Sequence, residues 1–179
     1  HRFDYNTPIE ETMQALHDVV KAGYVRYIGM SSCYAWQFHK MQNYARQHNL
    51  TEFISMQNLH NAIYREEERE MIPLLQDLGV GMIPWSPLAR GFLTRSVKED
   101  STRNQTDRVA EIAKKRGVSM AQVALAWSLS KPFVTAPIIG TTSMEKLKDL
   151  IAGVSLKLTE DEAKAIDEPY RPRATAGFA

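Results

Sequence analysis

Amphipathic stretches alternate with short apolar runs along this chain. Ile9, Met13, Leu16 and Val20 recur at the spacing of one helix face, and Gly23 follows as a stop signal. The apolar runs are short and show no clear two-faced alternation, which is typical of strands buried on both sides. These runs are YVRYIGMSS, FISMQN, VGMIPWSP and FVTAPIIG.

Start and stop signals indicate where the helices should lie. Thr7-Pro8 followed by Glu10 and Glu11 begins the first one, because Pro fits a first helical turn and acids suit the positive end of the helix dipole. Thr159 with Glu162 has the form of a capping box. The other predicted helices are residues 35–48, 65–79, 107–116, 119–130 and 143–152, with a long irregular segment from 88 to about 106.

Four strand–helix repeats predict an α/β fold in which helices cover a parallel sheet, in one domain spanning residues 1–179. Pro84 and Pro137 lie inside strand candidates, so we expect those strands to be short or irregular. An open nucleotide-binding sheet would want a GxGxxG turn, and the chain has none. Each run ends instead in residues able to bind ligands, which favours a (β/α) barrel, although four repeats are half of a closed one.

Composition narrows the classes of function. A net charge of +1 provides no strong field for nucleic acid or an anionic membrane, and no apolar run approaches the roughly 20 residues that span a bilayer. Cys33 is the single cysteine, which excludes an internal disulfide and a multi-thiolate metal site and suits a reducing compartment. We therefore expect a cytoplasmic globular domain, and the sequence does not set its oligomeric state.

Residues 1–32, 55–94 and 117–143 contain, in this order, motifs that include HRFD, SMQN, PWSPLARG and PIIGTTS. They resemble the aldo-keto reductases, in particular the aryl-alcohol-dehydrogenase-like branch, to which the potassium-channel β subunits are more distantly related. The resemblance implies a (β/α)8 TIM barrel, of which this chain would be the C-terminal half, from the end of strand 4 to strand 8 and a terminal helix. We therefore expect HRFD to end a fourth strand and the N-terminal half to lie upstream. Relatives also carry more chain near residues 107–108.

The resemblance implies an NADPH-dependent oxidoreductase that reduces aldehydes or ketones to alcohols by hydride transfer without a metal. The family uses an Asp, a Tyr, a Lys and a His, and only the His has a matching position here, His1. An imidazole can donate to a carbonyl oxygen and orient it, whereas an N-terminal His without such a role would be inert. The alternative is a non-catalytic remnant or a cofactor-sensing binding module of the same fold.

Cofactor contacts are implied at the ends of the predicted strands. Hydroxyl and amide groups at Ser31, Ser32 and Gln57 would hold the nicotinamide carboxamide, which offers two donors and an acceptor. Trp85 would stack on the nicotinamide ring. Without the resemblance, the two serines and Gln57 would be interpreted as ordinary polar loop residues, and Trp85 as part of the hydrophobic core. The full set of NADP(H) candidates is Ser31, Ser32, Gln57, Trp85, Ser86, Pro87, Leu88, Gly91, Lys98, Arg103, Gly140, Thr142, Lys146 and Asp149.

The stretch GTTSMEKLKDL is the candidate for phosphate binding. Gly140 lets the backbone approach a ligand, the following helix N-terminus attracts anions, and Lys146 adds a positive charge. The resemblance assigns this stretch to the adenosine 2′-phosphate and Asp149 to the adenine, while Leu150 replaces an Asn of the family. Lys98 and Arg103 would fold over the cofactor or else be solvated loop charges.

Other conspicuous residues have ordinary interpretations. The run REEERE (65–70) is typical of a solvated helix face with ion pairs one turn apart. Asp4 is interpreted as a structural partner in its loop, and Cys33 as structural because the sequence shows no partner that would stabilise a thiolate. Phe178 matches the C-terminal region that borders the family's substrate pocket.

Overall fold

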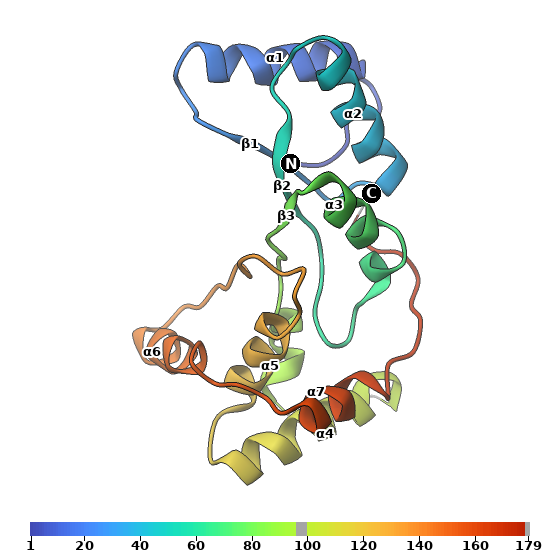
Figure 1. Cartoon of the computed structure of the whole chain (residues 1–179). Coiled ribbons are helices and arrows are strands. Elements are labelled where there is room, and N and C mark those ends of the chain that lie inside the picture. Colours follow the sequence, from blue (N-terminus) through green and yellow to red (C-terminus); the bar gives the residue numbers. More distant parts are fainter. Residues whose placement is uncertain (96–99, 178–179) are drawn as a thin grey trace. The chain divides into compact units, whose positions relative to one another are not determined.

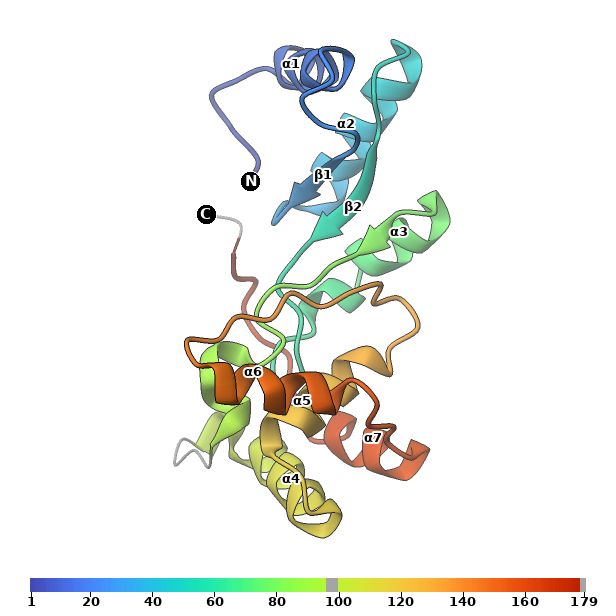
Figure 2. The same ribbon diagram turned by 90° about the vertical axis from the view of Figure 1, so that its left-hand side faces the viewer.

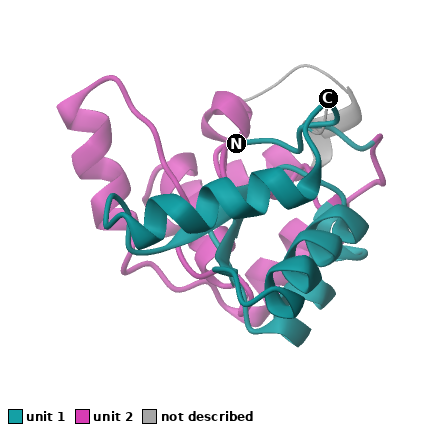
Figure 3. Cartoon of the chain, turned by 90° about the horizontal axis from the view of Figure 1, so that it is seen from above, with its two compact units in different colours: residues 1–58, 67–83, 175–179 teal, residues 59–66, 84–174 magenta. Residues whose placement is uncertain are grey.

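The computed structural model describes residues 1–95 and 100–177, and the backbone only within 100–104. The chain forms two compact units, coloured separately in Figure 3. Unit 1 contains residues 1–58, 67–83 and the C-terminal residues from 175, and unit 2 contains residues 59–66 and 84–174. Each unit has its own set of elements and is described by itself.

Unit 1 contains a parallel three-stranded sheet in the order β1-β2-β3, which confirms the predicted α/β alternation. Helices follow the strands in sequence, as the blue-to-green part of Figure 1 shows. Its elements are α1 (Ile9–Lys21), β1 (Ile28–Ser31), α2 (Ala35–Gln47), β2 (Phe53–Gln57), α3 (Met71–Leu78) and β3 (Gly81–Met82), with the short 3-10 helix η1 (Glu66–Glu68) before α3.

The two faces of this sheet differ in the size of their side chains. Met30 on β1 pairs with Met56 on β2, and both are buried. On the other face Gly29 pairs with Ser55, and a Cβ at Gly29 would lie 2.3 Å from the Ser55 hydroxyl oxygen, so any larger residue there would force the Ser55 side chain to move. The large apolar groups therefore form the core beneath the helices, and small polar groups line the opposite face.

Two predicted strands are shorter than expected. β3 ends at Met82, and the run 133–140 contributes only a parallel bridge between Ile138 and Trp85. The Ile138 N–H donates to the Pro84 carbonyl at 2.8 Å. Pro84 and Pro137 themselves have no N–H, so the ladder cannot extend through either residue.

Residues 1–4 form no strand, contrary to the expectation for HRFD. Asp4 turns the chain instead, since its Oδ1 accepts from the Asn6 N–H at 2.8 Å and its Oδ2 from the Thr7 hydroxyl at 2.7 Å. These hydrogen bonds hold the pKa of the Asp4 carboxyl below its ordinary value. Asp4 thus has the structural role that the sequence suggested, and α1 begins just after Pro8, its N-cap.

Unit 2 is helical around its own core, with the helices labelled α4 to α7 in Figures 1 and 2. The segment predicted as irregular in fact contains a 3-10 helix and the start of α4. The N-caps Ser119, Ser143 and Thr159 each accept a backbone N–H, and the capping box at Thr159 is confirmed. The elements are η2 (Ala89–Thr94), α4 (Asp100–Arg116), α5 (Met120–Leu129), α6 (Met144–Gly153) and α7 (Glu160–Asp167).

Trp127 on α5 lies at the centre of the unit 2 core and is fully buried. Its indole N–H donates to Asp167 on α7 at 2.8 Å, and His60 stacks on its ring. Asp167 also accepts from Lys131 and Arg65, so two cations share one carboxylate. Apolar packing and this ion cluster together fasten α7 to α5.

Across the described residues, no helix has both the length and the apolar character needed to cross a membrane.

Candidate functional site

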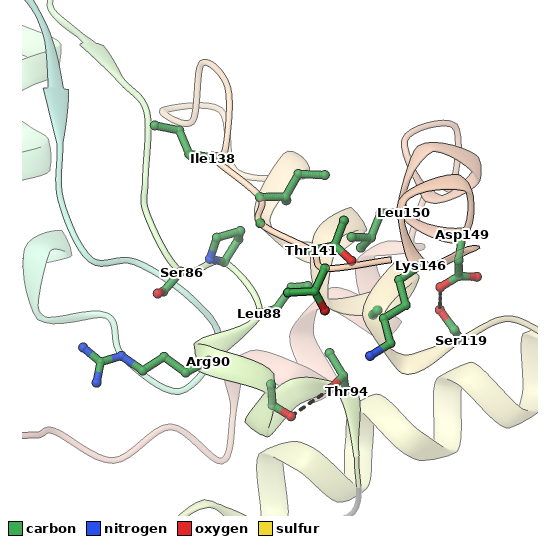
Figure 4. A pocket seen from close by; sticks show the side chains of 16 residues that line it. Ser86, Leu88, Arg90, Thr94, Ser119, Ile138, Thr141, Lys146, Asp149 and Leu150 are labelled. Carbon is green, nitrogen blue, oxygen red and sulfur yellow. Dashed lines mark hydrogen bonds between the residues drawn. The ribbon is translucent and has the colours of Figure 1, made fainter. Parts of the chain in front are cut away.

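A pocket of about 650 Å³ lies within unit 2. Its walls come from residues 86–94, the start of α5, the turn 138–142 and α6, as Figure 4 shows. Eight of the predicted cofactor residues line it: Ser86, Pro87, Leu88, Gly91, Gly140, Thr142, Lys146 and Asp149.

The wall formed by residues 86–94 has an unusual backbone. Ser86, Ala89 and Arg90 all have positive φ angles, of 53°, 50° and 53°, a conformation that non-glycine residues adopt at a cost of roughly 1–3 kcal/mol each. The Ser86 carbonyl accepts from the Asn61 amide at 2.9 Å and from the Ala89 N–H at 2.9 Å. Asn61 is buried, so a fixed side chain holds this wall in place.

The opposite wall is suited to an anion. Ser143 caps α6 by accepting the Lys146 N–H at 3.2 Å, and the Lys146 side chain is exposed. In Figure 4 it extends toward Thr94, whereas the Arg90 guanidinium points away from the pocket. Gly140 has open space where a Cβ would lie and does not have a positive φ. The fold itself therefore does not require glycine there, but close approach of a ligand to the backbone would.

Asp149 is held at the far end of the pocket by two side chains of the α5 N-terminus. The Ser119 hydroxyl donates to its Oδ2 at 2.6 Å, and the Gln122 amide donates to its Oδ1 at 2.9 Å. Leu150, where the family has an Asn, is buried and supplies no polar group. Sequence reasoning did not find the contacts of Ser119 and Gln122 to Asp149, because the S-x-x-Q spacing indicates only the start of α5 and these contacts join two helices.

The other predicted nicotinamide contacts lie together in unit 1. The Ser31 hydroxyl donates to the Gln57 carbonyl at 2.5 Å, and the hydroxyl oxygens of Ser31 and Ser32 are 3.4 Å apart. Ser32 has a positive φ of 43°. Its N–H donates to the side chain of Asn58 at 2.9 Å, which fixes this loop. The structure thus groups Ser31, Ser32 and Gln57 at the ends of β1 and β2.

The interpretation of REEERE as a solvated helix face was wrong. Glu67 is buried, and its Oε2 accepts from the Asn58 amide at 2.6 Å. Glu66, in unit 2, accepts from the Tyr170 hydroxyl and from the Arg173 N–H. Six charged residues in a row suggested solvent exposure, but the chain forms only a short 3-10 helix there, Glu66–Glu68, and two of the acids bind other parts of the chain.

Cys33 is a buried thiol, as its structural interpretation requires. Burial is the main cause that raises its pKa, to about 12, and the nearby Glu67 carboxylate contributes. A thiol with this pKa is protonated at neutral pH and is a poor nucleophile.

The remaining predicted residues lie elsewhere. His1 is exposed at the start of unit 1. Trp85 is half-buried in unit 2, bridging Leu59 and Ile138, and is not among the described residues that line the pocket. Lys98, the Arg103 side chain and Phe178 lie outside the described residues.

The parallel sheet of unit 1 and the helices of unit 2 define an α/β protein, and the unit 2 pocket, with a capped helix N-terminus, a lysine and a fixed carboxylate, is its candidate ligand site. The chain belongs to the aldo/keto reductase family, whose sequence model matches residues 1–171. This confirms the resemblance, and the family is one of oxidoreductases.

Three curated relatives illustrate the match. A Schizosaccharomyces pombe protein assigned as an aryl-alcohol dehydrogenase is 51% identical over 96% of this chain and 54% of its own length. The versiconal hemiacetal acetate reductase of Aspergillus parasiticus is 47% identical over 97% of this chain and 57% of its own. An aldo-keto reductase of Fusarium vanettenii is 49% identical over 100% of this chain and 53% of its own.

The chain therefore spans about half the length of these relatives. The alignment with the Fusarium protein extends over 199 positions, more than the 179 residues of this chain. Because that alignment covers the entire chain, the relative carries additional residues inside the matched region.

Proposed function

We propose that this chain is the cofactor-binding part of an NADPH-dependent oxidoreductase that reduces aldehydes or ketones to alcohols, in a (β/α)8 barrel that the whole protein forms. Membership of the aldo/keto reductase family supports the reaction class. The relatives' names concern an aryl alcohol and a hemiacetal acetate. We propose a small carbonyl compound or alcohol, including aromatic ones, as substrate, and, with one buried cysteine, a cytoplasmic compartment.

The pocket of unit 2 is the observation on which this proposal rests. It combines the Gly140 turn, the capped N-terminus of α6 and the exposed Lys146 on one side with the backbone of residues 86–91 on the other. Backbone N–H groups and a mobile ammonium suit phosphate oxygens. The residues present therefore fit the phosphate-bearing half of NADPH.

The roles of the residues follow from their chemistry. Gly140, Thr142 and Lys146 would bind the 2′-phosphate, and the segment from Ser86 to Gly91 would lie along the pyrophosphate. Ser31, Ser32 and Gln57 would bind the carboxamide of the nicotinamide, which supplies the hydride when the cofactor is bound. His1 would donate to the carbonyl oxygen of the substrate.

A cofactor-sensing binding module is the second candidate. It is favoured by the lining of the pocket, which among the described residues contains cofactor-type contacts such as Lys146 and Asp149 but no Tyr or His that could pass a proton to a carbonyl. The two candidates share the cofactor and differ in whether a carbonyl is turned over.

Titration of the chain with NADPH and with NADH, followed by calorimetry, tests the cofactor assignment. We expect Lys146→Met to weaken NADPH binding by about 5- to 10-fold and to leave NADH within about twofold, because only NADPH has the 2′-phosphate. Lys148→Met is the matched control, since Lys148 is exposed on the same helix but does not line the pocket. The titrations use the natural polypeptide that contains this chain, and absence of NADPH binding to that polypeptide would refute the proposal.

Turnover separates the two candidates. Oxidation of NADPH in the presence of benzaldehyde, measured with the natural polypeptide, is expected of the reductase. Tight NADPH binding without turnover of any aldehyde or ketone in a panel would support the sensing module.

A further inference from the structure

Gln122 does not line the pocket, but it binds Asp149, which does. It is not among the described lining residues, yet its amide Nε2 donates to the Asp149 carboxylate at 2.9 Å and to the Asp149 carbonyl at 2.8 Å. The Ser119 hydroxyl donates to the second carboxylate oxygen at 2.6 Å and accepts the Gln122 N–H at 3.1 Å. These hydrogen bonds connect Ser119 and Gln122 of α5 with Asp149 of α6.

Close packing restricts Gln122 further. A Cβ added at Gly153 would lie 3.0 Å from the Gln122 Cγ and 3.1 Å from its Cα, so the two helices touch through a glycine. Gly153 is buried, and α6 therefore leaves the glutamine side chain little room to change rotamer. A side chain held in this way can fix the direction of the group it binds.

The consequence concerns the Asp149 carboxylate. Each of its oxygens receives one hydrogen bond from the protein, and a carboxylate has about four acceptor positions. Asp149 lines the pocket and is the one acid among its described lining residues, while its neighbour Leu150 is apolar. The remaining acceptor capacity suits a ligand group that donates N–H, such as the amino group of a purine.

We propose that Gln122 is a positioning residue which orients Asp149, so that the pocket selects a base with an exocyclic amino group over one with a carbonyl in its place. The inference rests on the proposed function, because it places the base end of NADPH at Asp149. Gln122 acts through Asp149 and does not itself touch the ligand.

The test compares two ligands that differ at one position of the base, NADPH and reduced nicotinamide hypoxanthine dinucleotide phosphate. Hypoxanthine has a carbonyl where adenine has its amino group. Their dissociation constants are measured by calorimetry for the full chain and for Gln122→Met, which keeps the side-chain volume and removes the amide. The matched control is Gln105→Met, because Gln105 is a buried glutamine of unit 2 that donates to the Ala62 carbonyl, away from the pocket.

We expect the wild-type chain to prefer NADPH by about 10-fold or more, the usual value of one hydrogen bond to a charged group. In Gln122→Met the preference should fall below about threefold, while Gln105→Met keeps it. Equal weakening of both ligands in Gln122→Met, with the preference unchanged, would overturn the proposal and leave Gln122 a structural residue. Should that variant not fold, Ser119→Ala removes the other donor and is expected to reduce the preference as well, with an unchanged preference counting against the proposal.

Failure of the proposed function has a different signature. In that case the wild-type chain binds neither dinucleotide. Tight binding of both without any base preference would leave the cofactor assignment intact and refute only the role of Gln122 and Asp149.

Discussion

Asn58→Asp replaces the amide group that joins the Ser32 backbone to Glu67, and it should destabilise unit 1 strongly. Asn58 is fully buried and accepts the Ser32 N–H through Oδ1 while donating to Glu67 through Nδ2. The substitution keeps shape and volume but replaces the donor by a carboxylate oxygen 2.6 Å from another one. It therefore isolates the electrostatic part of the interaction.

The expected loss of unfolding free energy has two contributions. A hydrogen bond to a charged group is worth about 1.5–3 kcal/mol, and leaving a buried charge with the wrong partner raises the total to about 3–5 kcal/mol at pH 7. That is a large part of the roughly 5–15 kcal/mol that stabilises a domain. Two adjacent buried carboxylates share a proton, so the upper pKa of the pair rises above the unfolded value. The folded variant then binds more protons than the unfolded chain, and its stability is lost as pH rises through that raised pKa.

Urea unfolding followed by circular dichroism at pH 5 and pH 7.5 measures both effects. We expect the difference in free energy of unfolding between Asn58→Asp and the wild type to be clearly smaller at pH 5. Asn43→Asp provides the same chemical change at an exposed position of α2, where a shift within about 0.5 kcal/mol is expected at both pH values. A loss below about 1 kcal/mol at pH 7.5, or an equal loss at both pH values, would show that the Asn58–Glu67 contact does not have the assigned role.

Three further outcomes are expected. Glu162 has a pKa lowered to about 2, chiefly by its hydrogen bond with Arg116, so its contribution to stability is complete above about pH 4.5 and is lost as the pH falls toward 2. Thermal melting of Glu162→Gln should therefore show a smaller drop in melting temperature between pH 7 and pH 3 than that of the wild type. Gly153→Ala should lower stability by about 1–3 kcal/mol and weaken NADPH binding, because its Cβ would press on Gln122. Cys33, with its pKa of about 12, should react with iodoacetamide at least about 100-fold more slowly in the folded chain than in urea.

Features set by a few neighbouring residues could be predicted from the sequence. Thr159 and Glu162 form the expected capping box, and Gly79 ends α3 in the left-handed conformation. The helices followed from apolar periodicity, because burial of one helix face gives a repeat of 3.6 residues, and β1, β2 and β3 followed from short apolar runs between them. Pro84 and Pro137 were recognised as misfits in strands, and both lie where the ladder stops.

The partners of the site residues could not be predicted, because they depend on contacts between distant parts of the chain. Glu67 is an example: its neighbours in sequence are charged and indicate a surface, while its burial depends on Asn58 at the end of β2. Gln122 is another, since only the packing of α5 against α6 brings its amide to Asp149. A sequence pattern identifies a group that can bind, but a tertiary contact decides what it binds.

These partners share one chemical property, which explains where such contacts occur. Asn58 fixes the Ser32 loop, Asn61 fixes the carbonyl of Ser86, and Gln122 plays the same part in the other wall of the pocket. A neutral amide provides both donors and an acceptor, so it can tie a loop to a strand or helix when buried without the cost of desolvating a charge. Loops that must hold positive φ angles need such restraint, because their backbone conformation is not stabilised by regular ladders. Asn58 in unit 1, and Asn61 and Gln122 in unit 2, are therefore the residues whose substitution should perturb the polar groups of their own unit most without touching a ligand.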